Sequence, residues 1–418
     1  MKFLKKNIEK VYYIIGEGLA KGGALLLFPF FTNYLTKSDF GQLSLYWACL
    51  PFLSLFYDFS QRSYIKRIYI EKDSSFRSSF ISVSFFSFLV FSFFSLVYVF
   101  FFFLDISFIN LRFDIYLLLA AFLYTLIEIY FAFLQIKGEA KSYSILYILK
   151  MLLPYIVTAL MFLAYESGDP YFYPIAQIII FLLIVIGLAA KFLLKSDFKL
   201  LIHNFKKVVL KSFKFGAPMV LGALSATGLN VADRIIINIS EGDIDVANYT
   251  VAYTIASILT AFFMATNKWW QRFMLVNLKE DNISKLRKTI WKYVAVVFSV
   301  ALFINLFSRQ LVLLFSNDEY LGVISIIPTL LLGMLFYFLY TLMLNIPFYY
   351  KNTFFVILPA LMAFVVNTVL NIILIPKKGY EIAATTTTIA YFVEFLIIYI
   401  ICKKKYNLDL LFGKVTLN

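Results

Sequence analysis

Four cationic side chains stand inside apolar runs of the sequence: Lys21, Lys150, Arg234 and Lys268. A charge within such a run is costly in a membrane and usually faces a helix-bundle interior or water. An Arg guanidinium binds a phosphate group through two parallel hydrogen bonds, and a Lys ammonium binds it as a point charge. Because the four cations are expected at different depths, they could bind an anionic group successively as it crosses a membrane.

Three of these cations also have a structural interpretation. Lys21 follows Glu17 by four residues, so the two share a helix face and could neutralise each other. Arg234 could pair with its neighbour Asp233, and Lys268 could extend to the headgroups at the nearby end of its run. Each alternative remains open at this point.

Lys150 is different, because no acidic residue lies close to it in the sequence. It stands about seven residues into its run, which is roughly 10 Å deep at the rise of a helix. We therefore single out Lys150 as the strongest candidate for binding an anion.

Four carboxylates in the apolar runs are candidates for coupling to an ion gradient: Glu17, Asp58, Glu128 and Glu394. Burial in a bundle can bring the pKa of a carboxylate close to neutral pH, where it can carry a proton. The alternative is that each side chain hydrogen-bonds to neighbouring helices as a neutral acid. We expect no cofactor beyond a proton or sodium gradient.

Catalytic and metal chemistry is not indicated. The two cysteines, Cys49 and Cys402, lie in apolar runs, and the single histidine, His203, has no Cys or carboxylate cluster near it. The sequence contains no Walker, HExxH or GxSxG motif. We therefore predict a protein that is not an enzyme, has no metal site and does not itself hydrolyse a nucleotide.

The elements that must position these residues are membrane-spanning helices. The chain has 418 residues, of which 62% are hydrophobic and 15% charged, with a mean hydropathy of +0.84. A span needs about 20 apolar residues. Twelve runs are long enough: 11–35, 41–60, 78–104, 115–136, 144–165, 172–194, 216–239, 247–271, 289–316, 322–350, 354–375 and 381–402. The first is too long for a signal-peptide core and is interpreted as a retained span.

Lys and Arg residues between the runs support this count. If both termini are cytoplasmic, the outer segments hold only Lys37, Arg112, Arg309, Lys377 and Lys378, and the inner segments hold the other cations between runs. A missed span would reverse every later loop, so the persistent bias predicts twelve spans with both ends inside. The net charge of +14 then reflects cytoplasmic loops and does not indicate nucleic-acid binding.

The runs fall into two sets of six around a basic stretch. We predict an N-terminal bundle at 1–194, a cytoplasmic linker helix at 195–214, a C-terminal bundle at 215–402 and a cytoplasmic tail at 403–418. Apolar residues recur in the linker at near-helical spacing among its lysines, which is typical of a helix lying on anionic headgroups. Two halves that start on the same side favour parallel repeats with a path between them.

Four stretches carry a family resemblance. They are NYLTKSDFG at 33–41, KMLLP at 150–154, FGAPMVLGAL at 215–224 with the later Asp233–Arg234 pair, and NTVLNIILIPKKGYEIAAT at 367–385. The sequence resembles the polysaccharide flippase branch, which contains the O-antigen flippases, of the multidrug/oligosaccharidyl-lipid/polysaccharide exporter superfamily. One departure is the Glu381–Ile382 step after the Gly turn, where a Gly-Ala step is usual.

The resemblance implies an all-α MATE-like fold, with twelve transmembrane helices in two six-helix bundles forming a V around a central cavity. It implies a bacterial inner-membrane protein that moves an undecaprenyl-pyrophosphate-linked oligosaccharide from the cytoplasmic to the periplasmic leaflet by alternating access, for O-antigen or capsule. The four cations would then bind the pyrophosphate. Membrane lipids are further partners, with a polysaccharide polymerase or glycosyltransferases as candidates by pathway logic.

Three other functions remain as alternatives. A drug antiporter of the same superfamily should line its path with carboxylates and apolar groups instead of Lys and Arg. A lipid II flippase usually carries fourteen spans. An integral-membrane polymerase or glycosyltransferase usually exposes a large loop, whereas the outer loops predicted here are short.

Overall fold

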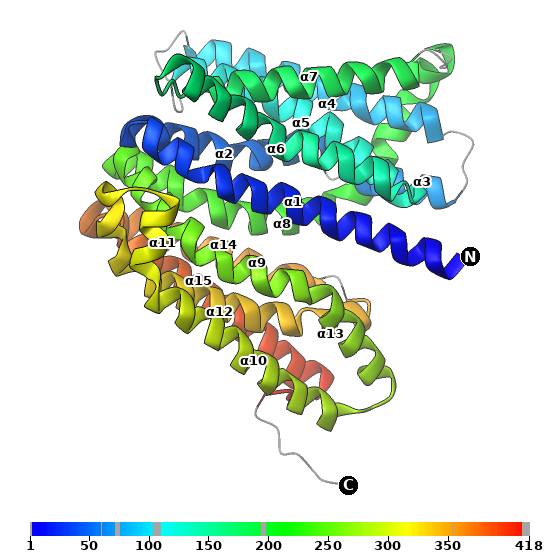
Figure 1. Cartoon of the computed structure of the whole chain (residues 1–418). Helices are drawn as coiled ribbons and strands as arrows, with labels where there is room; N and C mark the ends of the chain where they lie inside the picture. The colour runs from blue at the N-terminus through cyan, green and yellow to red at the C-terminus, as the bar shows by residue number, and fades with distance from the viewer. Residues whose placement is uncertain are drawn as a thin grey trace. The chain divides into compact units, whose positions relative to one another are not determined.

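The computed structural model describes residues 2–59, 61–71, 76–102, 110–193, 198–352 and 354–411, and none of them lies in a strand. Figure 1 shows the helices. Their bounds are α1 (Lys2–Tyr34), α2 (Lys37–Asp58), α3 (Arg62–Ile70), α4 (Phe76–Phe102), α5 (Leu111–Lys137), α6 (Ala140–Tyr165), α7 (Phe172–Leu193), α8 (Phe198–Glu241), α9 (Asp243–Lys279), α10 (Ile283–Leu306), α11 (Ser308–Phe315), the 3-10 helix η1 (Asp318–Ile326), α12 (Ile327–Met343), α13 (Asn345–Tyr349), α14 (Phe354–Lys378) and α15 (Ile382–Tyr406).

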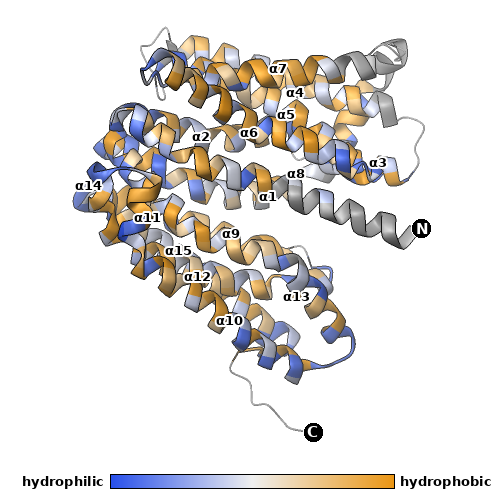
Figure 2. Cartoon of the chain, in the orientation of Figure 1, coloured by the Kyte–Doolittle hydropathy of each residue, from blue (hydrophilic) through white to orange (hydrophobic). Residues whose placement is uncertain are grey.

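The predicted all-α class is confirmed, and each predicted run corresponds to one helix, to consecutive helices or, for 216–239, to the second half of α8. Nine helical segments of the described residues are long and apolar enough to cross a membrane: α4, α5, α6, the second half of α8, α9, α10, η1 to α13 taken together, α14 and α15. The remaining three predicted runs are α1, α2 and α7. In Figure 2 the helices are largely hydrophobic, and hydrophilic residues gather at α3 and at the turn between α9 and α10.

The chain divides into two compact units, Met1–Leu224 and Ser225–Asn418. We expected a linker helix at 195–214 followed by a separate seventh span. Instead, Phe198–Glu241 forms the single continuous helix α8, and the division falls within it. The described part of the tail, up to Leu411, belongs to the second unit.

The first half of α8 packs on the first unit. Val208 is buried in an apolar cluster with Ile65 and Phe133, and the hydroxyl of Ser212 donates to Oε1 of Gln61 at 3.0 Å. Four lysines of this half are exposed: Lys206, Lys207, Lys211 and Lys214. The predicted amphipathic pattern is therefore present, but part of its apolar face covers protein, while the lysines remain free to face headgroups. The side chains of Leu200 and Leu201, which belonged to the predicted pattern, lie outside the described residues.

Helix α5 is the central element of the first unit. It begins where the side chain of Asn110 accepts the backbone N–H of Phe113 at 3.0 Å. It ends at Gly138, whose φ of 77° is the left-handed conformation that glycine adopts without strain. Between these ends, α5 packs against α2, α3, α4, α6 and α7. A polar residue in the middle of α5, such as Thr125, is consequently buried between helices.

The second unit centres on α15. This helix packs against both α12 and α14, and α9 packs against α12 and α10. Buried threonines of α15 meet buried asparagines of α14: Thr386 donates to Asn371, and Asn367 donates to Thr387 at 3.4 Å. Thr388 instead donates to the carbonyl of Thr329 on α12 at 2.7 Å.

Gly168 marks a tight contact between the α6–α7 turn and the end of α1. A Cβ added at Gly168 would stand 1.9 Å from the carbonyl oxygen of Tyr34. We predict that Gly168→Ala lowers the free energy of unfolding by about 1–3 kcal/mol, because the backbone must move apart. Thermal unfolding in detergent measures this. The control is Gly187→Ala, where nothing lies within 4 Å, and equal midpoints for the two variants would contradict the packing.

Candidate functional site

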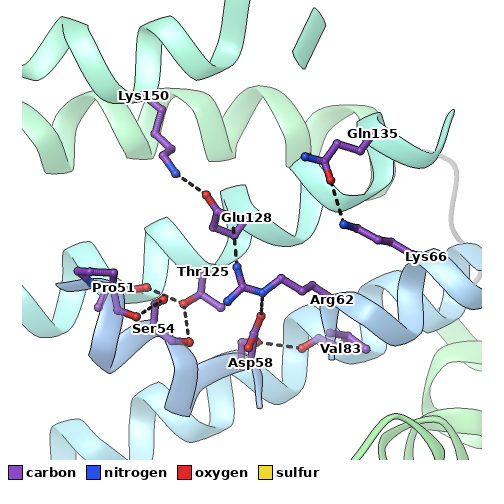
Figure 3. A network of polar contacts seen from close by, with 12 residues as sticks. Pro51, Ser54, Asp58, Arg62, Lys66, Val83, Thr125, Glu128, Gln135 and Lys150 are labelled. Atoms are coloured by element: carbon purple, nitrogen blue, oxygen red, sulfur yellow. Dashed lines mark hydrogen bonds and ion pairs between the residues drawn. The ribbon is translucent and has the colours of Figure 1, made fainter. Parts of the chain in front are cut away.

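Four charged side chains of the first unit form a chain of alternating sign, which we call the charge network: Asp58, Arg62, Glu128 and Lys150. Glu128 is in the middle. Its Oε1 contacts Nζ of Lys150, and its Oε2 lies 3.2 Å from a terminal nitrogen of Arg62. Nε of Arg62 lies 2.8 Å from Oδ2 of Asp58. Figure 3 shows these residues converging from α2, α3, α5 and α6.

Exposure differs along the charge network. The side chains of Asp58 and Lys150 are 0% and 1% exposed, whereas those of Glu128 and Arg62 are 20% and 24% exposed. Nζ of Lys150 also lies 3.8 Å from the ring centre of Tyr124, an arrangement that stabilises a cation. Lys150 is therefore enclosed by a carboxylate and aromatic rings, and the pair formed by Arg62 and Glu128 is the accessible part.

The local backbone explains how Arg62 enters the network. Helix α2 ends after Asp58, because Phe59 adopts a left-handed conformation with φ of 44°. The N–H of Gln61 donates to the carbonyl of Asp58 at 2.8 Å, and α3 starts one residue later. This tight turn holds the guanidinium of Arg62 beside Asp58, the carboxylate with which it pairs. We had placed Arg62 among the cations of a cytoplasmic loop, so its part in the network was missed.

The structure brings together two residues that we had assigned separate roles. Lys150, predicted to bind an anion, and Glu128, predicted to couple an ion, are direct partners. Asp58, another predicted coupling residue, joins them through Arg62. Lys150 has no acidic partner close by in the sequence, and its partner Glu128 lies 22 residues away on another helix.

Three further predicted residues belong to α1 and α9. The side chain of Lys21 is exposed on α1. The side chains of Glu17 and Lys268 lie outside the described residues. Their predicted roles stay predictions.

A second polar cluster surrounds Asp233 in the second unit. The carboxylate, on α8, is 1% exposed. It accepts hydrogen bonds from Tyr249 at 2.7 Å, from Thr387 at 2.8 Å and from Asn371. Asn371 in turn donates to Asn367 at 3.1 Å. These partners are neutral, and we call them the neutral cage of Asp233.

Arg234 does not pair with Asp233, and the proposed ion pair between them is wrong. Nε of Arg234 donates to Thr250 at 3.2 Å, a terminal nitrogen donates to the carbonyl of Asn230 at 2.7 Å, and the guanidinium lies 5.0 Å from the ring centre of Tyr253. Successive residues of a helix point in different directions, so neighbours in sequence do not face each other. Arg234 is 9% exposed, and its guanidinium lies among hydroxyl groups and an aromatic ring.

The neutral cage was missed by the sequence analysis, although a signal was present. Asn367 and Asn371 are four residues apart and therefore share a helix face. They belong to the same stretch that carried the family resemblance, and Asp233 belongs to another. Two polar residues on one face of an apolar run indicate that this face has a polar partner inside the protein, and Asp233 in another apolar run is such a partner.

Glu394 occupies a third position, on α15. It is 4% exposed, and among the described residues its Oε2 has no hydrogen-bond partner. Its predicted role in ion coupling stays a prediction.

The charge network predicts a measurable coupling between Glu128 and Lys150. Glu128→Gln leaves the enclosed ammonium of Lys150 without its partner, which should cost about 3–5 kcal/mol of unfolding free energy. Lys150→Met should cost less, because Glu128 keeps its contact with Arg62. The double variant carries neither of the two charges, so its loss of unfolding free energy should be much smaller than the sum of the losses of the single variants. Unfolding of the wild type, the two single variants and the double variant in detergent measures the free energies that the comparison needs. Additive losses would show that the two side chains do not stabilise each other.

Comparisons with known proteins agree with this fold. The structure superimposes on a multidrug resistance MATE family transporter of the MOP superfamily in an inward-facing conformation, with a TM-score of 0.72 and 14% identity over 96% of this chain and 98% of that chain. It also resembles the lipid II flippase MurJ in an inward closed conformation, with a TM-score of 0.64 and 18% identity over 95% and 87% of the two chains.

A third similar structure is a MOP superfamily transporter from Pyrococcus furiosus described as having a binding pocket of reverse polarity, with a TM-score of 0.60 and 13% identity over 95% of this chain and 94% of that chain. No curated protein sequence matches the chain. Residues 6–268 match the family described as polysaccharide biosynthesis protein. Because this match covers well over half of the sequence, the chain belongs to the polysaccharide biosynthesis protein family.

Proposed function

We propose that the protein is a flippase for an undecaprenyl-pyrophosphate-linked oligosaccharide. It would move the repeat unit from the cytoplasmic to the outer leaflet of the bacterial inner membrane, for O-antigen or capsule synthesis. The family membership supports a role in polysaccharide synthesis. The observation that carries the proposal is the presence of Arg62 and Lys150 as buried or half-buried cations around one carboxylate in the first unit.

The chemistry of such a cargo fits these residues. Its pyrophosphate is the only charged part between an apolar lipid and a neutral or weakly charged sugar, so it is the part that the bilayer interior excludes most strongly. Arg62 can bind two phosphate oxygens at once, and Lys150 can add a point charge. Arg234, partly enclosed by Tyr253 and Thr250, offers a second guanidinium within the other unit.

The membrane orientation follows from charge. The turn between α5 and α6 carries Lys137 and Lys141, which by the positive-inside rule belongs on the cytoplasmic side. Glu128 lies nine residues before the end of α5, or about 14 Å along the helix axis. The charge network would therefore stand within the cytoplasmic half of the membrane, where the cargo is made.

Movement of the cargo needs an energy source, and the sequence contains no Walker motif. Alternating access coupled to a proton or sodium gradient would supply it. Asp233 is the best placed carboxylate for the coupling cation, because it is buried among oxygen and amide groups and the side chains that donate hydrogen bonds to it are neutral. Glu17, Asp58, Glu128 and Glu394 remain the other candidates.

The gradient proposal predicts that Asp233→Asn separates transport from its driving force. The amide keeps the size of the side chain but carries no charge, so a bound cation no longer has a counterion. In vesicles with an imposed proton or sodium gradient, the wild type should accelerate and Asp233→Asn should not. If the wild type is equally fast with and without either gradient, the coupling proposal fails.

Deletion of the gene tests the flippase function directly. The lipid-linked oligosaccharide pool is labelled, and its leaflet is determined with a reagent that does not cross the membrane. Complete repeat units on undecaprenyl pyrophosphate should accumulate at the cytoplasmic face. Intact surface polysaccharide without accumulation would instead favour a small-molecule antiporter with the same fold.

Complementation of the deletion tests Lys150. Lys150→Ala should abolish flipping while the protein remains in the membrane, because the enclosed ammonium is lost. The matched control is Lys404→Ala, since Lys404 is exposed in the last turn of α15. Surface polysaccharide and membrane protein level are both measured. Normal activity of the Lys150→Ala protein would rule out its role.

A further inference from the structure

Glu128 holds a position that suits a phosphate group. One of its oxygens contacts the ammonium of Lys150, and the other contacts the guanidinium of Arg62. A phosphate also presents two oxygens side by side, and it carries at least as much negative charge as a carboxylate. The two anions would therefore compete for the same pair of cations.

We infer that Glu128 is an internal competitor of the substrate pyrophosphate: it neutralises Arg62 and Lys150 in the substrate-free protein, and a proton on Glu128 releases both cations for the anion. This inference rests on the proposed flippase function and adds a proton-controlled step at the same site. The step forms one O–H bond on Glu128 with a proton from water and replaces two ion pairs by two contacts to phosphate oxygens.

The cations are arranged to stay in place after Glu128 is neutralised. Arg62 keeps its contact of 2.8 Å with Asp58, which is itself fully buried. Lys150 keeps its place over the ring of Tyr124. Both cations are thus oriented in advance, and an incoming anion would meet a preformed site.

Exposure gives the side from which an anion could approach. Glu128 and Arg62 retain about a fifth or more of their side-chain surface, at 20% and 24%, whereas Lys150 retains 1%. A phosphate would first contact the guanidinium of Arg62 and would reach Lys150 only if Glu128 moved aside. Glu128 therefore controls access to the enclosed ammonium.

The charges around Glu128 determine the direction of the pH effect. The titratable groups that face it or its two cations are Asp58 of α2, Arg62 and Lys66 of α3, Tyr124 of α5, and Tyr147 and Lys150 of α6. The four members of the charge network sum to zero when Glu128 is ionised. A proton on Glu128 makes the sum positive, so binding of an anion should strengthen as the pH falls.

Binding of inorganic pyrophosphate to the purified full-length protein tests the inference. Wild type and Glu128→Gln are titrated by calorimetry in detergent at mildly alkaline and mildly acidic pH. Comparison at one pH cancels the ionisation of pyrophosphate itself. At alkaline pH, Glu128→Gln should bind at least about tenfold more tightly than the wild type. The difference should shrink as the pH falls, because binding of the anion to the wild type takes up a proton on Glu128.

Two further variants separate competition from a general loss of negative charge. Glu71→Gln removes an exposed carboxylate that pairs with Arg67 on α3, and it should bind pyrophosphate as the wild type does. Glu128→Gln combined with Lys150→Met should lose the gain in affinity. If Glu128→Gln is too unstable for calorimetry, thermal unfolding is measured instead. Added pyrophosphate should then raise the unfolding midpoint of Glu128→Gln more than that of the wild type. Equal rises of the two midpoints would refute the inference.

The outcomes distinguish this inference from the function on which it rests. Equal pyrophosphate affinity of wild type and Glu128→Gln at alkaline pH would mean that Glu128 is a structural clamp, while the flippase proposal would stand. Absence of pyrophosphate binding in both proteins, together with normal surface polysaccharide in a Lys150→Met strain, would overturn both.

Discussion

The ammonium of Lys150 is enclosed by helices and aromatic rings, and Glu128 lies against it as its counterion. An isolated buried charge costs several kcal/mol even in a relaxed protein, and the cost is offset only by an opposite charge in good geometry. The same carboxylate also holds Arg62, which in turn fixes Asp58. The turn after α2, the start of α3 and the packing of α5 against α6 all meet at this one side chain.

The two units bury charge in opposite ways. The first unit pairs two acids with two bases, so a change at Glu128 alters the charge of a whole network. The second unit surrounds Asp233 with the neutral donors Tyr249, Thr387 and Asn371, so its negative charge has no cation among these partners. A flippase for an anionic lipid that is driven by a cation gradient needs one site of each kind. In our proposal, the first unit supplies the anion site and the second supplies the cation site.

The helices could be predicted from the sequence, because apolar length and the distribution of Lys and Arg are local properties of the chain. The partners of the buried charges could not. Glu128 and Lys150 were both recognised as unusual, yet only the packing of α5 against α6 places them in contact. A pair between Asp233 and Arg234 was left open because they are neighbours, whereas the helix turns them in different directions. Arg62 was assigned to a loop because it lies between two apolar runs. The turn that directs it inward depends on the left-handed backbone of Phe59, which the sequence does not reveal. Periodicity on α14 indicated a shared face for Asn367 and Asn371, but not which residue they would bind.

The central claim is that this single chain moves a pyrophosphate-linked lipid across a membrane by means of paired cations in its first unit. The most direct measurement reconstitutes the purified protein in vesicles without nucleotide, with a labelled undecaprenyl-pyrophosphate-linked oligosaccharide in one leaflet. The fraction of lipid that reaches the opposite leaflet is then followed over time. We predict transfer with the wild type and none with Lys150→Met, although both proteins are folded. Equal transfer by the two proteins would contradict the account. So would transfer by the wild type that is no faster than in vesicles without protein.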